Sequence, residues 1–417
     1  MLPTKPVAGR LHGLRLPPDW PTIARGAWVC AVVGLTIYAF CLPYAHTVYD
    51  VYLRAARLWL EGQDIYVPGR EYYRYSPLFA VSLTPLALLP DGASAAAWKL
   101  INCGVFAWGL YICARRLTPR RWSADEVSAA MLLVLPLAMH SLYNSQANLL
   151  MLGSLLLGLV AAGEDKWNRA AIWIAWATLI KGYPLALAML LIGLFPRQFA
   201  LRYVLSLSGG LLLPFATQRP SVVVMQYQSW FVHLRDSTEM MRERLRSIDQ
   251  LFVVYGQPIS ERTFALLGLI AGAAVMLICL SIARRTCDRR EVIFQTLLWF
   301  SLWVVLFGPA TESCTYVAAA PAITWALVEV WHRRAPWPER ALLVGSLLMM
   351  GPMVTDMFGK TVRNFSNEHG SQPIGGLILL AWLAVEWRRR AKTAGRDAQA
   401  LPSPSEGMME HHARSAA

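Results

Sequence analysis

Long apolar runs separated by short basic clusters dominate the chain. A helix that crosses the roughly 30 Å hydrocarbon core of a bilayer needs about 20 mostly apolar residues, and segments approaching this length recur throughout. They are residues 27–45, 94–114, 126–142, 146–162, 203–217, 262–283, 292–308, 315–331, 341–356 and 373–387. The pattern predicts an all-α polytopic membrane protein with about 11 to 13 transmembrane or half-membrane helices.

Two apolar stretches do not fit a simple crossing. Residues 77–90 are short and are interrupted by Pro85, which favours a juxtamembrane or re-entrant helix. Residues 170–195 must leave the cytoplasmic side and return to it, because basic clusters flank the stretch at both ends. The residues Lys181-Gly182-Tyr183-Pro184 lie halfway along it. Two half-length helices with a break at the lysine explain this length, whereas a single long helix would reverse the orientation of everything downstream.

Composition and charge support a membrane protein. Of the 417 residues, 56% are hydrophobic and only 16% are charged, against about 25% charged in ordinary soluble domains. The net charge of +13 is spread over short clusters between apolar runs, as the positive-inside rule predicts for cytoplasmic loops. No basic stripe with exposed aromatics indicates a nucleic-acid partner. We therefore expect a multi-pass protein of the cell (inner) membrane.

This topology gives a domain organisation. We expect a cytoplasmic leader at 1–26, a single transmembrane domain at 27–390 and a disordered cytoplasmic tail at 391–417. Within the domain, 46–93 would be a first outer loop with juxtamembrane helices, and 218–260 a second outer loop. The seven cysteines are an odd number and lie mostly in apolar runs, and His140 and His233 are isolated, so no metal site or other cofactor is predicted.

Two charged residues are the main candidates for chemistry on the outer face. Asp50 follows the first span and opens a helical pattern at 50–60, where a carboxylate at the membrane edge could act as a general base. It could equally be a surface acid paired with Arg54. Lys181 is costly in lipid and should therefore face a cavity, where a lysine can bind phosphate. The alternative is a lysine that extends to the outer interface.

Other polar residues fall on the same predicted side. Asn144, Gln146 and Asn148 open the 146–162 segment and could bind sugar hydroxyls, or could cap and join helices. Glu312 follows Gly308-Pro309 and could bind sugar or serve as a second acid, or could be an ordinary loop residue. The sequence Tyr72-Tyr73-Arg74-Tyr75 suits a pyranose face and a phosphate, or an interfacial aromatic belt.

Several short motifs in the first half of the chain resemble one enzyme family. Asp50 is followed by Gly62-Gln63-Asp64-Ile65-Tyr66, Tyr75-Ser76-Pro77-Leu78, Ser145-Gln146-Ala147-Asn148 and Ile180-Lys181-Gly182-Tyr183-Pro184. In order and spacing they are similar to the motifs of glycosyltransferase family 87, in the superfamily C fold of polytopic glycosyltransferases. The segment Gly308-Pro309-Ala310-Thr311-Glu312 departs from the family pattern, in which a Ser-Pro turn with a nearby histidine is common.

The resemblance implies an enzyme that transfers a hexose, usually mannose, from a polyprenyl-phosphate donor to a lipid or glycan acceptor. Asp50 would match the family's general base, and Lys181, with Arg74, would contact the donor phosphate. Tyr75, Asn144, Gln146, Asn148 and Glu312 would contact the sugar or acceptor. A transporter or lipid flippase of envelope glycan precursors, and a non-catalytic assembly subunit, are the alternative functions. The sequence does not indicate an oligomeric state.

Overall fold

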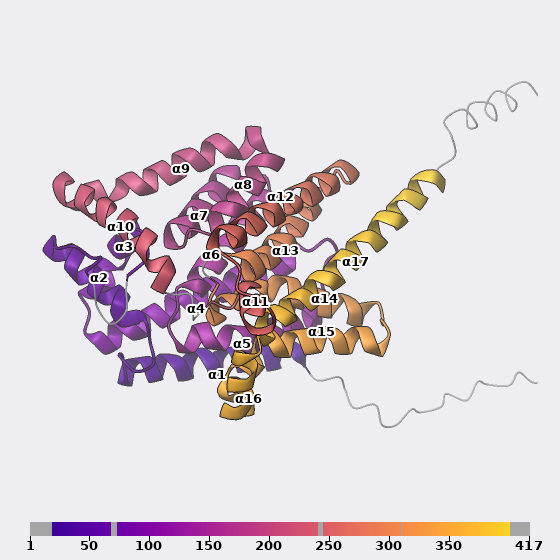
Figure 1. Ribbon diagram of the computed structural model, residues 1–417, viewed down its shortest axis with the longest axis horizontal. Coiled ribbons are helices and arrows are strands. Elements are labelled where there is room, and N and C mark those ends of the chain that lie inside the picture. The colour runs from indigo at the N-terminus through magenta and orange to yellow at the C-terminus, as the bar shows by residue number, and fades with distance from the viewer. Residues whose placement is uncertain (1–18, 68–72, 241–244, 310, 401–417) are drawn as a thin grey trace, which may run out of the picture.

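The computed structural model describes residues 19–67, 73–240, 245–309 and 311–400, and these ranges are helical without any strand (Figure 1). Seven of the described helices are long and apolar enough to cross a membrane. They are Trp20–Cys41 (α1), Asp91–Arg116 (α4), Ala124–Tyr143 (α5), Pro196–Ala216 (containing α9, Leu201–Leu212), Glu261–Arg285 (α12), Arg289–Phe307 (α13) and Ser313–His332 (containing α14, Ala320–His332). The all-α polytopic membrane fold predicted from the sequence is confirmed.

The remaining helices include the irregular ones expected from the sequence. They are Tyr49–Glu61 (α2), Pro77–Ala87 (α3), Asn148–Gly163 (α6), Trp167–Ile180 (α7), Pro184–Leu194 (α8), Pro220–Met240 (α10), Asp249–Tyr255 (α11), Trp337–Met350 (α15), Lys360–Glu368 (α16) and Ser371–Ala400 (α17). The 170–195 stretch is divided at Lys181 into α7 and α8, as the two-helix interpretation requires. The 77–90 stretch forms the short helix α3, which ends before it could span a bilayer.

Two expected irregular segments are more ordered than the sequence suggested. Residues 218–260 contain α10 and α11. The tail was expected to begin at residue 391, and α17 continues through it to Ala400. Alanine, lysine and arginine have high helix propensity, and a helix already started can extend through them. Residues 401–417, and the leader up to residue 18, lie outside the described range.

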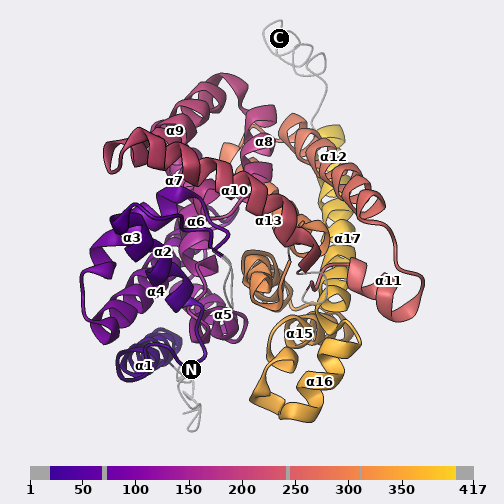
Figure 2. The same cartoon turned by 60° about the vertical axis from the view of Figure 1, so that its left-hand side comes forward.

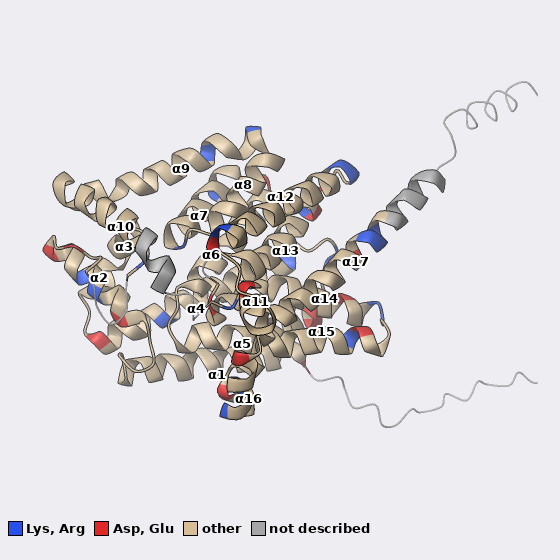
Figure 3. Cartoon of the chain, viewed as in Figure 1, with Lys and Arg blue, Asp and Glu red and all other residues tan. Residues whose placement is uncertain are grey.

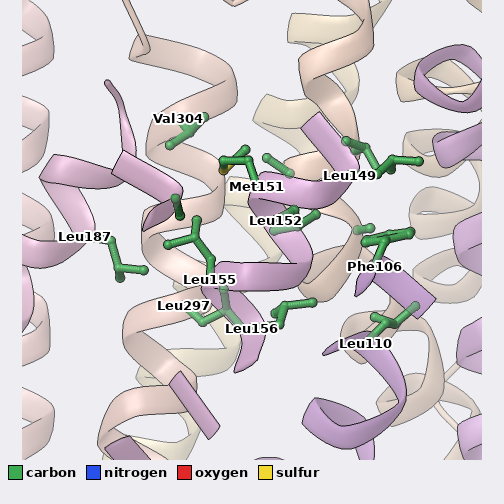
Figure 4. Close-up of a cluster of buried hydrophobic side chains, with 14 of the residues drawn as sticks. Phe106, Leu110, Leu149, Met151, Leu152, Leu155, Leu156, Leu187, Leu297 and Val304 are labelled. Atoms are coloured by element: carbon green, nitrogen blue, oxygen red, sulfur yellow. The ribbon is translucent and has the colours of Figure 1, made fainter. Parts of the chain in front are cut away.

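Helix α6 lies at the centre of the bundle. It packs against α4 and α7 and also contacts α13, and almost every one of its side chains is buried. Figure 4 shows its leucines surrounded by Phe106 and Leu110 from α4, Leu187 from α8, and Leu297 and Val304 from α13. A helix that is apolar on every side is expected to be enclosed by other helices, as α6 is.

Two glycines allow α4 and α6 to touch through their backbones. A Cβ atom on Gly109 would lie 2.6 Å from the carbonyl oxygen of Gly153, and one on Gly153 would lie 2.6 Å from the carbonyl oxygen of Val105. Close approach through small residues is the usual packing solution between helices in membranes. It brings the polar face of α4 near the turn that precedes α6.

The helices form two groups with a polarised charge distribution. In Figure 2, α1–α7 lie on one side and α13, α15 and α17 on the other. Basic residues lie at the end of α12, at residues 388–390 of α17 and around the start of α15 (Figure 3). At this basic end Arg390 of α17 lies 3.6 Å from Glu329 of α14 and 4.0 Å from Glu291 of α13. Arg120, just before α5, is 2.7 Å from Glu126 of α5 and 3.6 Å from Glu329 of α14, so ion pairs join four helices at this end.

Candidate active site

Both groups of helices line a large cavity of about 1310 Å³. Its walls come from α2, the segment 74–75, the α5–α6 turn, the α7–α8 break, α8, α10, residues 245–246, α12, α13, Pro309 and the segment 312–314. Its lining residues with polar side-chain groups or a thiol are Tyr52, Arg74, Tyr75, His140, Gln146, Lys181, Tyr183, Arg246, Trp303, Glu312, Ser313 and Cys314. Segments far apart in the sequence therefore contribute polar groups to one space.

Lys181 enters this cavity because the helix stops at it. Its backbone is extended, with φ −140° and ψ 143°, and its N–H donates to the carbonyl of Ala177 at 3.0 Å, which closes α7. Pro184 cannot donate a backbone hydrogen bond and begins α8. The break turns the lysine out of the helical path, and no hydrogen bond or ion pair joins its ammonium to another described residue. The start of α8 adds positive helix dipole nearby.

The loop that carries Arg74 and Tyr75 is fastened to the same break. The Ser76 hydroxyl donates to the carbonyl of Leu179, in the last turn of α7, at 2.5 Å. The guanidinium of Arg74 lines the cavity beside Lys181, and its Nε has no hydrogen-bond partner among the described residues. The hydroxyl of Tyr183 is likewise buried without a described partner. Two cations and an unpaired hydroxyl therefore share this wall.

Tyr52 connects three walls of the cavity. Its hydroxyl is 2.6 Å from that of Tyr75 and accepts a hydrogen bond from the backbone N–H of Ala147 at 3.3 Å. The two rings also meet edge to face, with centroids 5.0 Å apart. Burial raises the pKa of Tyr75 well above its usual value, so its hydroxyl stays protonated and can donate. This link fixes the position of α2 relative to the 73–76 loop and the α5–α6 turn.

The α5–α6 turn presents Gln146 to the cavity and is held by α4. Trp98 Nε1 donates to the carbonyl of Ser145 at 2.9 Å. Asn102 donates to the carbonyl of Gln146 at 2.7 Å and accepts from the N–H of Leu150 at 2.6 Å. Lys99, which is only 2% exposed, donates from Nζ to the carbonyls of Leu142 and Tyr143. A buried ammonium at a helix C-terminus satisfies carbonyls that the helix leaves unpaired.

Glu312 also lines the cavity and lies at the start of a 3₁₀ helix, Ser313–Ala319. The N–H of Glu312 donates to Thr315 Oγ1 at 3.3 Å, which sets the carboxylate at the helix N-terminus. The Ser313 hydroxyl is 3.2 Å from His140 Nδ1, so α5 and this helix are joined beside the cavity. The sequence left His140 as an isolated histidine, but it lines the cavity.

Other predicted site residues lie apart from the lining. Asp50 is exposed on α2 and is not among the described lining residues, although Val48 and Val51 on either side of it are. Asn144 ends α5 and donates to the carbonyl of His140 at 3.1 Å. Asn148 is fully buried and sits 3.5 Å from the Ser141 hydroxyl. Asn144 therefore caps α5 and Asn148 joins α6 to α5, which are the contacts given as the alternative to sugar binding.

The rest of the cavity is apolar. Leu185 and Met189 line it from α8, and Leu269 and Gly272 line it from α12. Leu269 is 71% exposed, and Met189 is 56% exposed. Trp303 of α13 donates from Nε1 to the carbonyl of Gly268 at 2.9 Å and so closes the inner side of this groove. The polar chamber thus continues into an apolar passage between α8 and α12.

Several lining residues were missed from the sequence. Tyr183 lies two residues after Lys181 in the helix break, and this position could have indicated that it lines the cavity. Tyr52, Arg246 and Ser313 carried no distinguishing pattern, because each reaches the cavity through tertiary packing. Burial lowers the pKa of Arg246. Within the described residues, no group of three or more His, Cys, Asp or Glu is placed to hold a metal ion.

Comparison with known proteins identifies the family of the chain. The sequence model of glycosyltransferase family 87 matches residues 73–309, which is more than half of the chain. The match includes Arg74, Gln146 and Lys181. A comparison with curated proteins found no match. The chain therefore belongs to glycosyltransferase family 87 and is a membrane glycosyltransferase.

Proposed function

We propose that this glycosyltransferase moves a hexose from a polyprenyl-phosphate donor to a lipid or glycan acceptor. The observation that carries the proposal is the cavity in which Lys181 and Arg74 lie beside an apolar passage between α8 and α12. A polyprenyl-phosphate sugar fits both parts of this cavity, because its anionic phosphate suits the two cations and its long apolar chain suits the passage. A nucleotide sugar has no part that suits the apolar passage.

The phosphate would bind at the wall formed by the break and the 73–76 loop. Lys181 offers a point charge and Arg74 a planar fork of donors, both suited to phosphate oxygens. Arg74 Nε and the Tyr183 hydroxyl lack described partners, and buried donors without acceptors are destabilising by about 1–3 kcal/mol each. Phosphate oxygens would accept hydrogen bonds from both, so donor binding would remove that penalty.

The isoprenoid chain would leave through the passage lined by Leu185, Met189 and Leu269. These side chains are substantially exposed in the protein alone, which suits a face covered by lipid. The donor would then enter sideways from the bilayer. This explains why the transferase is embedded in the membrane.

The transfer would be one inverting displacement. The acceptor hydroxyl oxygen forms a bond to the anomeric carbon as the bond from that carbon to the donor phosphate oxygen breaks. The leaving phosphate keeps the bonding electrons, and Lys181 and Arg74 stabilise its charge. The acceptor proton goes to a base, for which we propose Asp50. Asp50 is exposed on α2 beside the cavity-lining Val51, which suits a base that meets an acceptor arriving from water.

The sugar itself would lie between the phosphate wall and Glu312. Gln146 and Glu312 both line this space and can hydrogen-bond hydroxyl groups. Mannose is the hexose we propose, following the family resemblance. The cavity is built from turns at the ends of helices opposite the basic clusters. Under the positive-inside rule this supports an inner-membrane enzyme with its active site on the extracytoplasmic face.

Purified enzyme with labelled polyprenyl-phosphate mannose and a lipid or glycan acceptor tests the proposal. We expect Lys181→Met to lower turnover by about 10²–10³-fold, because it removes charge stabilisation of the leaving group. Lys360→Met on exposed α16 is the matched control and should transfer normally. Wild-type turnover by the Lys181 variant, or no transfer by the wild type from any polyprenyl-phosphate hexose, would refute the proposal.

A second pair of variants tests the base. Asp50→Asn should lose about 10²–10⁴-fold in turnover while donor binding is retained. Glu312→Gln should chiefly raise the KM. The reverse result would assign the base to Glu312 instead of Asp50.

A further inference from the structure

A second cavity, of about 530 Å³, is lined by α4, α6 and α7 of the first helix group. Helices α4 and α7 both pack against α6, and the cavity is the trough between them, with α6 as its floor. None of its lining residues lines the active-site cavity. It therefore needs an explanation of its own.

Most of the trough is apolar and open. Gly104, Trp108 and Ile112 follow one another along α4 at four-residue steps, so they share one face of the helix. A Cβ atom on Gly104 would meet nothing within 4 Å. Trp108 is 57% exposed. Leu157 on the floor and Trp173 on the far wall complete a surface suited to a hydrocarbon chain.

One end of the trough is cationic. Arg116 lies in the last turn of α4, and Lys166 and Arg169 lie at the start of α7. Glu164 is 2.8 Å from Arg116 and 2.6 Å from Lys166, so one carboxylate serves two cations. Arg169 makes no ion pair or side-chain hydrogen bond with a described residue. Three cations and one anion leave two positive charges at this end.

The charges lie where a lipid headgroup would lie. Arg116, Lys166 and Arg169 are at helix ends, whereas the apolar lining extends along the helices from that level. Basic pockets between helices at the cytoplasmic surface are typical sites for anionic lipids. We infer that this trough binds one anionic phospholipid, with an acyl chain along α4 and the phosphate at Arg116, Lys166 and Arg169.

The charge contribution can be tested by native mass spectrometry of the detergent-purified enzyme. Phosphatidylglycerol and phosphatidylcholine with the same acyl chains are added at equal concentrations, and bound lipid is counted. We expect the wild type to prefer phosphatidylglycerol. Arg169→Gln should weaken its retention about five-fold, and the double variant with Lys166→Gln about 25-fold, since each cation near a headgroup contributes about a five-fold factor. Arg284→Gln, an exposed cation at the same end but outside the trough, is the control.

The apolar contribution has its own pair of variants. Gly104→Leu should fill the open part of the trough and reduce retention, with no clash because the site is empty. Gly34→Leu on α1 enters equally open space and should leave retention unchanged. Thermal unfolding of each variant checks that it is folded. Equal retention of the two lipids, equal loss in Arg284→Gln and Arg169→Gln, or full retention by Gly104→Leu would overturn the inference.

Discussion

The contact between α4 and α6 gives the sharpest prediction about this fold. In Gly109→Ala the new methyl group would begin 2.6 Å from the carbonyl oxygen of Gly153. Such contacts are tolerated only at about 3.0–3.4 Å, so the two backbones must separate by about 0.4–0.8 Å. Overpacking of this kind destabilises by about 1–3 kcal/mol. The obstacle is backbone, which cannot rotate away as a flexible side chain would.

Helix α4 contains its own control, five residues away. Gly104→Ala places its methyl group in open space, and alanine favours the helix over glycine by about 1 kcal/mol. Its melting temperature should therefore equal or exceed that of the wild type. Gly109→Ala gains the same helix preference but carries the overpacking cost, so it should melt about 2–6 °C below Gly104→Ala.

Tryptophan fluorescence of detergent-solubilised protein, at one scan rate for all variants, measures the difference. A common scan rate matters because unfolding of such proteins is often irreversible. Equal melting temperatures for the Gly104 and Gly109 variants would refute the argument that the backbones touch.

Three further predictions concern the active-site cavity. Lys99→Met removes the donor to the carbonyls of Leu142 and Tyr143, so it should destabilise the fold by about 1.5–3 kcal/mol. It should also lower kcat, because the turn that carries Gln146 becomes looser. An unchanged melting temperature and unchanged turnover would contradict this. Tyr52→Phe should lower the melting temperature and raise the KM for donor, because it separates Tyr75 from the α5–α6 turn; a KM like that of wild type would count against it. Leu269→Trp should raise the KM for a long-chain donor but not for a short-chain one, and equal effects on both would exclude the passage as the route of the chain.

Much of the fold could be predicted because the bilayer limits the choices. The length of the apolar runs and the break at Lys181 are local features of the sequence. The apolar runs predicted helices, and the break predicted the division into α7 and α8, which the structure contains. The ordered end of α17 was missed because helix propensity acts in a polar segment without an apolar pattern. Helix α10 was missed for a similar reason, since residues 218–260 were judged by polarity and not by periodicity.

The candidate site could be predicted only in part. Local sequence indicated three of the lining residues: Lys181 as a cation in an apolar run, and Arg74 and Gln146 in motifs near helix ends. All three line the cavity, together with Tyr75 and Glu312. Lys99 carried a similar signal, yet it faces the α5 carbonyls and not the cavity. A charged residue in an apolar run thus needs a partner. The sequence does not tell whether this partner is the carbonyls at a helix end or a bound ligand.

The break at Lys181 connects the stability of the fold to the chemistry we propose. A continuous helix through residues 170–195 would keep the lysine within the helical path, and Pro184 would leave the carbonyl of Ile180 without its helical hydrogen bond. The broken helix leaves carbonyls at the end of α7 without helical donors. The Ser76 hydroxyl donates a hydrogen bond to one of them, the carbonyl of Leu179. Ser76 lies two residues after Arg74, so the contact that stabilises the break also brings the second cation to the first. The phosphate wall and the helix break are therefore one structural unit.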